Sequence, residues 1–185
     1  MDIRSPGVRG SSRAFTLIEL IIVLAMTSIV LSIGVPGIGS LLGSSRITSA
    51  VNTMVHHLHY ARSEAVRSGF SVILCPSVAG NACDDSFHWE RGFILFIDKD
   101  GNRKPGGDEK VLRHANTGNS HTSIFTSVGR KKITYQASGM APGSTATFTV
   151  CDPDNRVAPK AVILSNPGRP RLSDTQADGS PIKCI

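Results

Sequence analysis

Two arginines that flank a single proline are the residues in this sequence best suited to bind an anion. They lie in the segment Gly168-Arg169-Pro170-Arg171. Arginine keeps its charge at all physiological pH values and presents a planar set of N–H donors that match phosphate oxygens. Pro170 fixes one backbone dihedral between the two side chains, and Pro167 with Gly168 predicts a loop. A solvated surface turn is the alternative, because a basic tetrapeptide alone is a weak signal.

Other basic residues could extend such a site. Three of them, Arg156, Lys160 and Lys183, lie in the same C-terminal third, and Arg130-Lys131-Lys132 form a second cluster. Nearby acids oppose them: Asp152, Asp154, Asp174 and Asp178. The chain has 20 basic and 14 acidic residues, a net charge of +6, and only 5% aromatic residues. Because aromatic rows for base stacking are missing, any nucleic-acid binding is expected to involve the phosphate backbone, without sequence preference and with strong salt dependence.

Two segments could bind metal, but the sequence favours structural roles for both. His56, His57 and His59 share a helical segment in which Glu64 is the nearest acid. Residues 98–109 place acids or amides at several positions of a calcium loop. The sixth position of such a loop must be glycine, and here it is Arg103. A hairpin with an Asp-Gly-Asn turn explains this segment better, so we predict no metal and no cofactor.

Catalytic motifs are missing as well. The sequence has no G-x-S-x-G elbow, no H-E-x-x-H helix and no Walker loop. We therefore predict that the protein is not an enzyme.

Four cysteines, Cys75, Cys83, Cys151 and Cys184, are compatible with three disulfide pairings. We favour Cys75–Cys83, which closes a short loop, and Cys151–Cys184, which would attach the C-terminus to a strand. A zinc site is the alternative, but the sequence has no C-x₂-C pair.

The elements that would position these residues begin with an apolar segment at residues 15–35, in which Glu19 is the only ionisable side chain. Its length suits a helix that crosses a bilayer core of about 30 Å. Arg4, Arg9 and Arg13 precede it and predict a cytoplasmic N-terminus and an exported C-terminal part. The segment is longer than the apolar region of a cleaved signal peptide. A plain membrane anchor does not explain Glu19, because a charge near the centre of such a helix costs about 2.5–3.5 kcal/mol.

The junction Ala14-Phe15-Thr16-Leu17-Ile18-Glu19 resembles the processing site of type IV prepilins and type II secretion pseudopilins. The resemblance implies that prepilin peptidase cuts between Ala14 and Phe15, and that the new amine of Phe15 is methylated. Glu19 would then pair with the N-terminal amine of a neighbouring subunit, so that each charge offsets the desolvation of the other. Ala14 departs from the family, which usually has glycine there. Loss of a leader of net charge +2 leaves the mature chain near +4.

Beyond this segment, residues 36–69 are predicted to continue the helix with one apolar face. Its members recur every three or four residues: Ile47, Val51, Met54, Val55, Leu58, Ala61, Ala65 and Val66. The remaining residues, 70–185, alternate short apolar runs with turn residues, which predicts a β-rich domain. Strands are expected at 70–75, 92–97, 111–114, 123–126, 132–136, 146–151 and 160–164. The expected fold is α+β, a long helix packed on an antiparallel, sandwich-like domain.

Further segments resemble the FimT and GspH branch of the pilin superfamily. They are Ala61-Arg62-Ser63-Glu64-Ala65-Val66-Arg67, Val72-Ile73-Leu74-Cys75-Pro76, and Trp89 followed by residues 92–98 and Gly101-Asn102. Residues 168–171 resemble the GRxR signature of FimT proteins, which are implicated in binding incoming DNA in competent bacteria. The resemblance implies a minor pilin, held in the inner membrane and then assembled with other pilins into a fibre that binds double-stranded DNA. A structural minor pilin or secretion pseudopilin that does not bind DNA is the alternative.

Overall fold

The structure is a computed structural model that describes residues 15–115 and 121–184, excluding the side chains of residues 33–38. Residues up to Gly39 and residues from Ser40 onward form two separate compact units. The predicted leader, residues 1–14, lies outside the described residues. One helix, α1 (Leu17–Ser68), contributes residues to both units, as expected for a helix that continues from the apolar segment into the amphipathic one.

The first unit contains the apolar start of α1. Thr16 caps this helix, because the backbone N–H of Glu19 donates to its Oγ1 at 3.3 Å, and Thr followed three residues later by Glu is typical of a capping box. The hydroxyls of Thr27 and Ser32 donate to carbonyls of the helix itself. Large apolar side chains between Phe15 and Leu31 are exposed in the chain on its own. Within the residues that the structure describes, no helix is both long and apolar enough to be assigned as a membrane crossing.

In the second unit, α1 buries a single apolar face, as the periodicity predicts. Six side chains are less than 5% exposed: Ile47, Val51, Met54, Leu58, Ala61 and Ala65. Val55 is half-buried, but Val66 is 57% exposed, so its assignment to this face is wrong. Successive helical residues point about 100° apart, and Ala65 takes the inward position in that turn. Gly69 follows the helix with φ of 74°, a left-handed conformation that ends the helix.

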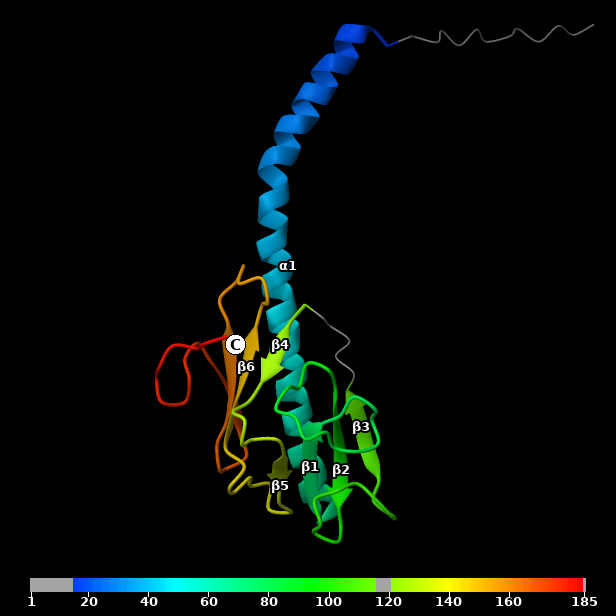
Figure 1. The fold of residues 1–185 in the computed structure, drawn as a ribbon, viewed down its shortest axis with the longest axis vertical. Helices are drawn as coiled ribbons and strands as arrows, with labels where there is room; N and C mark the ends of the chain where they lie inside the picture. Colours follow the sequence, from blue (N-terminus) through cyan, green and yellow to red (C-terminus); the bar gives the residue numbers. More distant parts are fainter. Residues whose placement is uncertain (1–14, 116–120, 185) are drawn as a thin grey trace, which may run out of the picture. The chain divides into compact units, whose positions relative to one another are not determined.

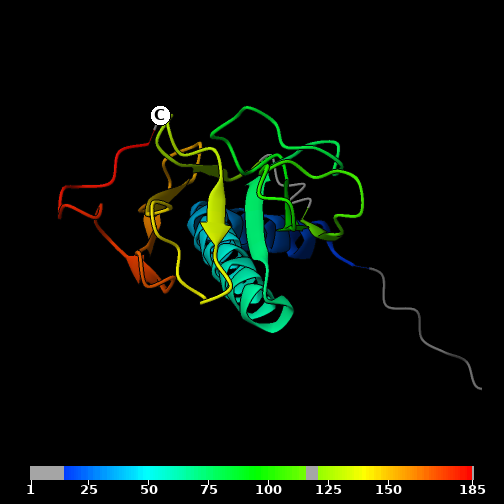
Figure 2. The same cartoon turned by 90° about the horizontal axis from the view of Figure 1, so that it is seen from below.

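Two four-stranded antiparallel sheets accompany this part of the helix, in the orders β3-β2-β1-β5 and β4-β6-β7-β8. The two figures show them arching around one side of α1 (Figures 1 and 2). The strands are β1 (Ser71–Pro76), β2 (Phe93–Asp98), β3 (Val111–Ala115), β4 (Ser123–Phe125), β5 (Ile133–Tyr135), β6 (Ala146–Cys151), β7 (Lys160–Leu164) and β8 (Pro170–Ser173). Seven of them were predicted to within one or two residues, whereas β8 was not predicted.

The α1 face and both sheets share one hydrophobic core. Trp89, which is fully buried, joins the sheets: its ring lies 5.9 Å from that of Phe93 on β2 and 5.0 Å from that of Phe148 on β6. Its indole N–H donates to Thr126 Oγ1 at 3.2 Å, so the polar atom of the ring is satisfied. The helix is therefore a third layer. Without it, each sheet would expose its apolar face to solvent.

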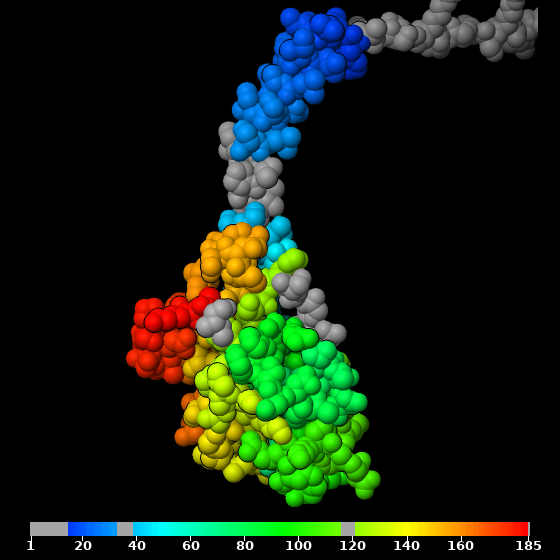
Figure 3. Space-filling model, viewed as in Figure 1, coloured from blue at the N-terminus to red at the C-terminus, as the bar shows by residue number. Residues whose placement is uncertain are grey.

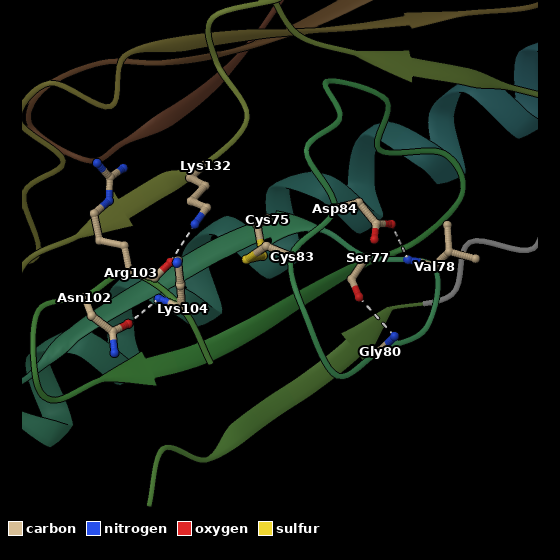
Figure 4. Close-up of a disulfide and its surroundings, with 10 residues drawn as sticks. All are labelled: Cys75, Ser77, Val78, Gly80, Cys83, Asp84, Asn102, Arg103, Lys104 and Lys132. Carbon is tan, nitrogen blue, oxygen red and sulfur yellow. Dashed lines mark hydrogen bonds between the residues drawn. A yellow bond between two sulfur atoms is a disulfide. The ribbon is translucent and has the colours of Figure 1, made fainter. Parts of the chain in front are cut away.

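Both predicted disulfides are present. Cys75 on β1 pairs with Cys83, and Cys151 at the end of β6 pairs with Cys184. Figure 4 shows the loop that the first disulfide closes, in which the Val78 N–H donates to the Asp84 carboxylate at 2.8 Å. Cys75 belongs to a second buried cluster, with Ile73, Ile94 and Phe96.

The burial difference along α1 leads to a stability prediction. Met54→Ala should lower the free energy of unfolding by about 2–5 kcal/mol, because it leaves a cavity in the shared core. Val66→Ala, on the same helix but exposed, should change it by less than about 0.5 kcal/mol. Urea unfolding followed by circular dichroism measures both values. Equal effects for the two variants would contradict the burial of this helical face.

Candidate functional site

The segment 168–171 lies at the edge of the second sheet. Pro170 is the first residue of β8, opposite Leu164 of β7, and Arg171 lies opposite Ile163. The loop prediction is therefore correct only for the residues before Pro170, and Arg171 belongs to a strand. Proline is tolerated at the start of an edge strand, where its missing N–H breaks no ladder hydrogen bond. A rigid strand, and not a free loop, positions Arg171.

Gly168 fixes the turn that precedes β8. Its φ is 75°, its N–H donates to Ser165 O at 2.8 Å, and a Cβ at this position would lie 2.2 Å from Gly139 O. Only glycine fits both the left-handed backbone and this close approach. The Ala141 N–H also donates to Asn166 O at 2.8 Å. The turn at 165–169 is thus held against the turn at 138–144, which fixes the backbone of Arg169.

The guanidinium groups of Arg169 and Arg171 are free to bind an anion. Both residues are exposed, and within residues 15–115 and 121–184 neither has an ion pair or a side-chain hydrogen bond. Arg171 lies opposite Ile163 in the ladder and so shares its face of the sheet. The orange-to-red residues, which include β8, form part of the surface visible in Figure 3.

Arg156, predicted as a supporting residue, has a structural role instead. Its Nε and one terminal nitrogen donate to the Asp152 carboxylate at 3.0 and 2.9 Å, and it also pairs with Asp154 at 2.8 Å. Asp152 is 2% exposed, and its hydrogen bonds with Arg156 lower its pKa to about 2. Two carboxylates thus neutralise this guanidinium, and it has no free charge for an anion.

Lys160 and Lys183 also lie apart from the two arginines. Lys160 pairs with Asp174 and lies opposite Val150, near the end of β6. Lys183 adjoins Cys184, which is bonded to Cys151 at that same end. Arg171 is aligned, through Ile163, with Thr147 near the start of β6. These two ends of β6 are four residues apart along the strand, which is about 13 Å. The C-terminal disulfide therefore lies at the far end of β6 from the position aligned with Arg171.

The second basic cluster also separates in space. Arg130 donates to Gly143 O, Lys131 pairs with Asp85 at 2.8 Å, and Lys132 donates to Arg103 O at 2.6 Å (Figure 4). Burial lowers the pKa of Lys132. Of the three, only Arg130 reaches the turn at 138–144. The three residues are consecutive in the sequence but do not form one basic patch.

The acidic segment at 98–109 is a hairpin connection, as predicted. Asp98 accepts from the N–H groups of Gly101 and Arg103 at 3.1 and 3.3 Å, and Glu109 accepts from the Lys99 N–H at 2.8 Å. Carboxylate oxygens of Asp98, Asp100 and Glu109 lie within 4.8 Å of one another. These oxygens organise the turn between β2 and β3.

His57, in the middle of the histidine triplet, is half-buried against β2. Its Nδ1 lies 2.8 Å from Thr53 O, and its ring meets that of Phe93 edge-on at 5.1 Å. Desolvation lowers its pKa. His56, His57 and His59 do not form a ligand set within the described residues.

At the other end of the chain, Phe15 and Glu19 are exposed at the start of α1. The Glu19 carboxylate has no partner within the part of the chain that the structure describes. Ala14, the residue before the predicted cut, lies outside the described residues.

One residue near the arginines was missed by the sequence analysis. Arg62 of α1 lies beside Gly139, since a Cβ on that glycine would be 3.2 Å from Arg62 Nε. No local signal could have revealed this, because 77 positions separate Arg62 from Gly139 along the chain (139 minus 62).

The chain thus has a long N-terminal helix with a threonine cap before Glu19, followed by strands that form two antiparallel sheets. The comparisons agree. The model of the family Type II transport protein GspH matches residues 50–168, and that of the prokaryotic N-terminal methylation motif matches residues 9–35. The chain belongs to the GspH family.

Solved structures show the same fold. The type IV minor pilin FimU of Pseudomonas aeruginosa superposes with a TM-score of 0.57 at 19% identity, over 77% of this chain and 97% of that chain. A second crystal form of FimU gives 0.54 at 20% identity, over 75% and 99%. No curated protein sequence matches significantly.

The Asp152–Arg156 pair gives a pH prediction. The pKa of Asp152 falls from 3.8 to about 2 on folding, so the unfolded chain binds this proton more readily. The pair therefore stabilises the fold fully above about pH 4, and this contribution is lost as the pH falls through about 2. Melting temperatures measured between these pH values should fall less steeply for Asp152→Asn than for wild type. Asp174→Asn, at the exposed pair, should behave as wild type. An unchanged slope in Asp152→Asn would contradict the assignment.

Proposed function

We propose that this protein is a minor type IV pilin that is incorporated into a pilus and binds duplex DNA, without sequence preference, for uptake in natural transformation. The observation that carries the proposal is the pair of uncompensated guanidinium groups, Arg169 and Arg171, on a backbone fixed by Gly168 and Pro170. Each of the other cations predicted for this site either has a carboxylate partner or lies at the far end of the sheet. Two fixed, free arginines suit phosphate oxygens, which every sequence of DNA presents alike.

The route to the fibre follows from the N-terminal residues. Prepilin peptidase would cut between Ala14 and Phe15, and Phe15 would be N-methylated. Residues 15–35 would hold the protein as a single pass in the inner membrane, with the C-terminal domain in the periplasm, until assembly with other pilins places it in a fibre at the cell surface. The apolar side chains exposed on α1 from Phe15 to Leu31 would then be covered by lipid or by neighbouring helices.

The DNA test uses the full chain in a neutral detergent and the fluorescence anisotropy of a short labelled duplex. Arg169→Gln/Arg171→Gln should weaken binding about tenfold at low salt. Between about 50 and 200 mM NaCl it should reduce the slope of log affinity against log salt by about 2, since two phosphate contacts are lost. Lys99→Gln/Lys104→Gln removes the same charge from the exposed connection between β2 and β3 and should bind nearly as wild type. Equal losses in both variants, or no binding by wild type, would refute DNA contact by these arginines.

A second prediction concerns Glu19. Glu19→Gln keeps the Thr16 cap, because that cap uses only the backbone N–H at this position, but removes the charge that would meet the N-terminal amine of another subunit. We expect normal removal of the leader and at least about a tenfold loss of this protein from sheared fibres, since an unpaired amine in apolar surroundings is costly. Immunoblots of cells and fibres measure both steps. Wild-type incorporation of Glu19→Gln would contradict the proposed pairing.

The alternative is a type II secretion pseudopilin or a purely structural minor pilin. The match to the family named for the type II transport protein GspH favours this reading. This alternative predicts that deletion of the protein abolishes secretion or piliation, and that the purified chain does not bind DNA. The anisotropy experiment therefore separates the two functions.

A further inference from the structure

We propose that Arg62, on the C-terminal part of α1, is a third phosphate-binding residue, and that Arg62, Arg169 and Arg171 together form one surface for the DNA backbone. This three-arginine surface rests on the proposed function but adds an element, the helix, that the sequence motif does not contain. It joins residues from α1 with residues from the turn before β8 and from β8 itself.

Gly139 lies between the two parts of this surface. On one side, a Cβ built on Gly139 would lie 3.0 Å from Val66 Cγ2 and 3.2 Å from Arg62 Nε. On the other side, the Gly139 carbonyl oxygen lies only 2.2 Å from the position that a Cβ on Gly168 would take. The peptide at Gly139 is thus enclosed by the helix and by the turn that carries Arg169. A single backbone unit separates the Arg62 side chain from that turn.

The charge of the Arg62 guanidinium is available to bind an anion, whereas that of Arg67, five residues later on α1, is not. Glu64, which is 5% exposed, binds Arg67 through both carboxylate oxygens. Arg62 is half-buried, and within the described ranges it has no carboxylate partner. A cation that is partly desolvated and unpaired favours an incoming anion, because part of the cost of removing water from it has already been met.

The surface next to Arg62 is open to solvent. Arg62 borders a shallow hollow of about 650 Å³ on the outer side of α1, together with His59, Ser63, Val66 and Arg67. Val66 is 57% exposed and Met140, on the adjoining turn, is 46% exposed. Nothing in the described chain covers this hollow, so a rod-shaped ligand that contacts the turn carrying Arg169 can also contact the helix.

Duplex DNA fits this surface better than a small anion does. The three guanidinium groups are held on three separate segments, and they do not surround one enclosed pocket. A duplex carries one negative charge per about 1.7 Å of its axis, and it releases counterions when separate phosphates are contacted. The hollow has no Phe, Tyr or Trp among its lining residues, so the contact would again be with the DNA backbone and not with bases.

The test compares Arg62→Gln with Arg46→Gln in the same anisotropy titration. Arg46 is also half-buried on α1, but it lies 16 residues earlier, about 24 Å along the helix axis. Arg62→Gln should weaken DNA binding about three- to tenfold and reduce the salt slope by about 1, whereas Arg46→Gln should match wild type. Arg62→Lys keeps the charge and should restore most of the affinity. Melting curves verify that each variant is folded.

The outcomes separate this inference from the proposed function. If Arg169→Gln/Arg171→Gln weakens binding but Arg62→Gln has the same affinity and salt slope as wild type, DNA binding stands and the role of Arg62 is refuted. If Arg62→Lys loses as much affinity as Arg62→Gln, Arg62 acts by packing against Gly139 and not as a phosphate ligand. If wild type does not bind duplex DNA, both proposals fail.

Discussion

The fold depends on one apolar face of a single helix. Six side chains of α1, from Ile47 to Ala65, are buried in a core to which both sheets contribute. Burial of one large aliphatic side chain stabilises a protein by about 1.5–3 kcal/mol, so this face is a large part of what holds the domain together. Neither sheet has a complete core without it. The positions of the turns at 138–144 and 165–169, and hence of the arginines, follow from this packing.

The sequence predicted those elements whose signals are local. The helical period and the apolar runs of seven strands each occupy a short window of sequence. The fold class and the two disulfides agree with the structure as well. The strand β8 was not predicted because Pro167, Gly168 and Pro170 are turn signals, and only the ladder with β7 makes the second half of that segment extended.

At the candidate site, the sequence alone predicted less than it did for the fold. In the sequence, Arg156, Lys160 and Arg171 are equivalent positive charges close to one another. In the structure, Asp152 and Asp154 in the same turn neutralise Arg156, Asp174 beyond β8 neutralises Lys160, and Arg171 remains free. Conversely, Arg62 joins the site through Gly139, a contact between distant parts of the chain. A net charge of +6 says nothing about which cations are paired, because pairing depends on tertiary geometry.

The disulfide between Cys151 and Cys184 has a mechanical consequence. The two cysteines are 33 positions apart, and Arg169 and Arg171 lie inside the segment that they close. Without the bond, a pulled chain of this length could extend by more than about 100 Å. With the bond, both ends of the segment that contains β7 and β8 are held at β6, an interior strand of its sheet. The cross-link therefore limits how far this segment can extend when the domain is pulled.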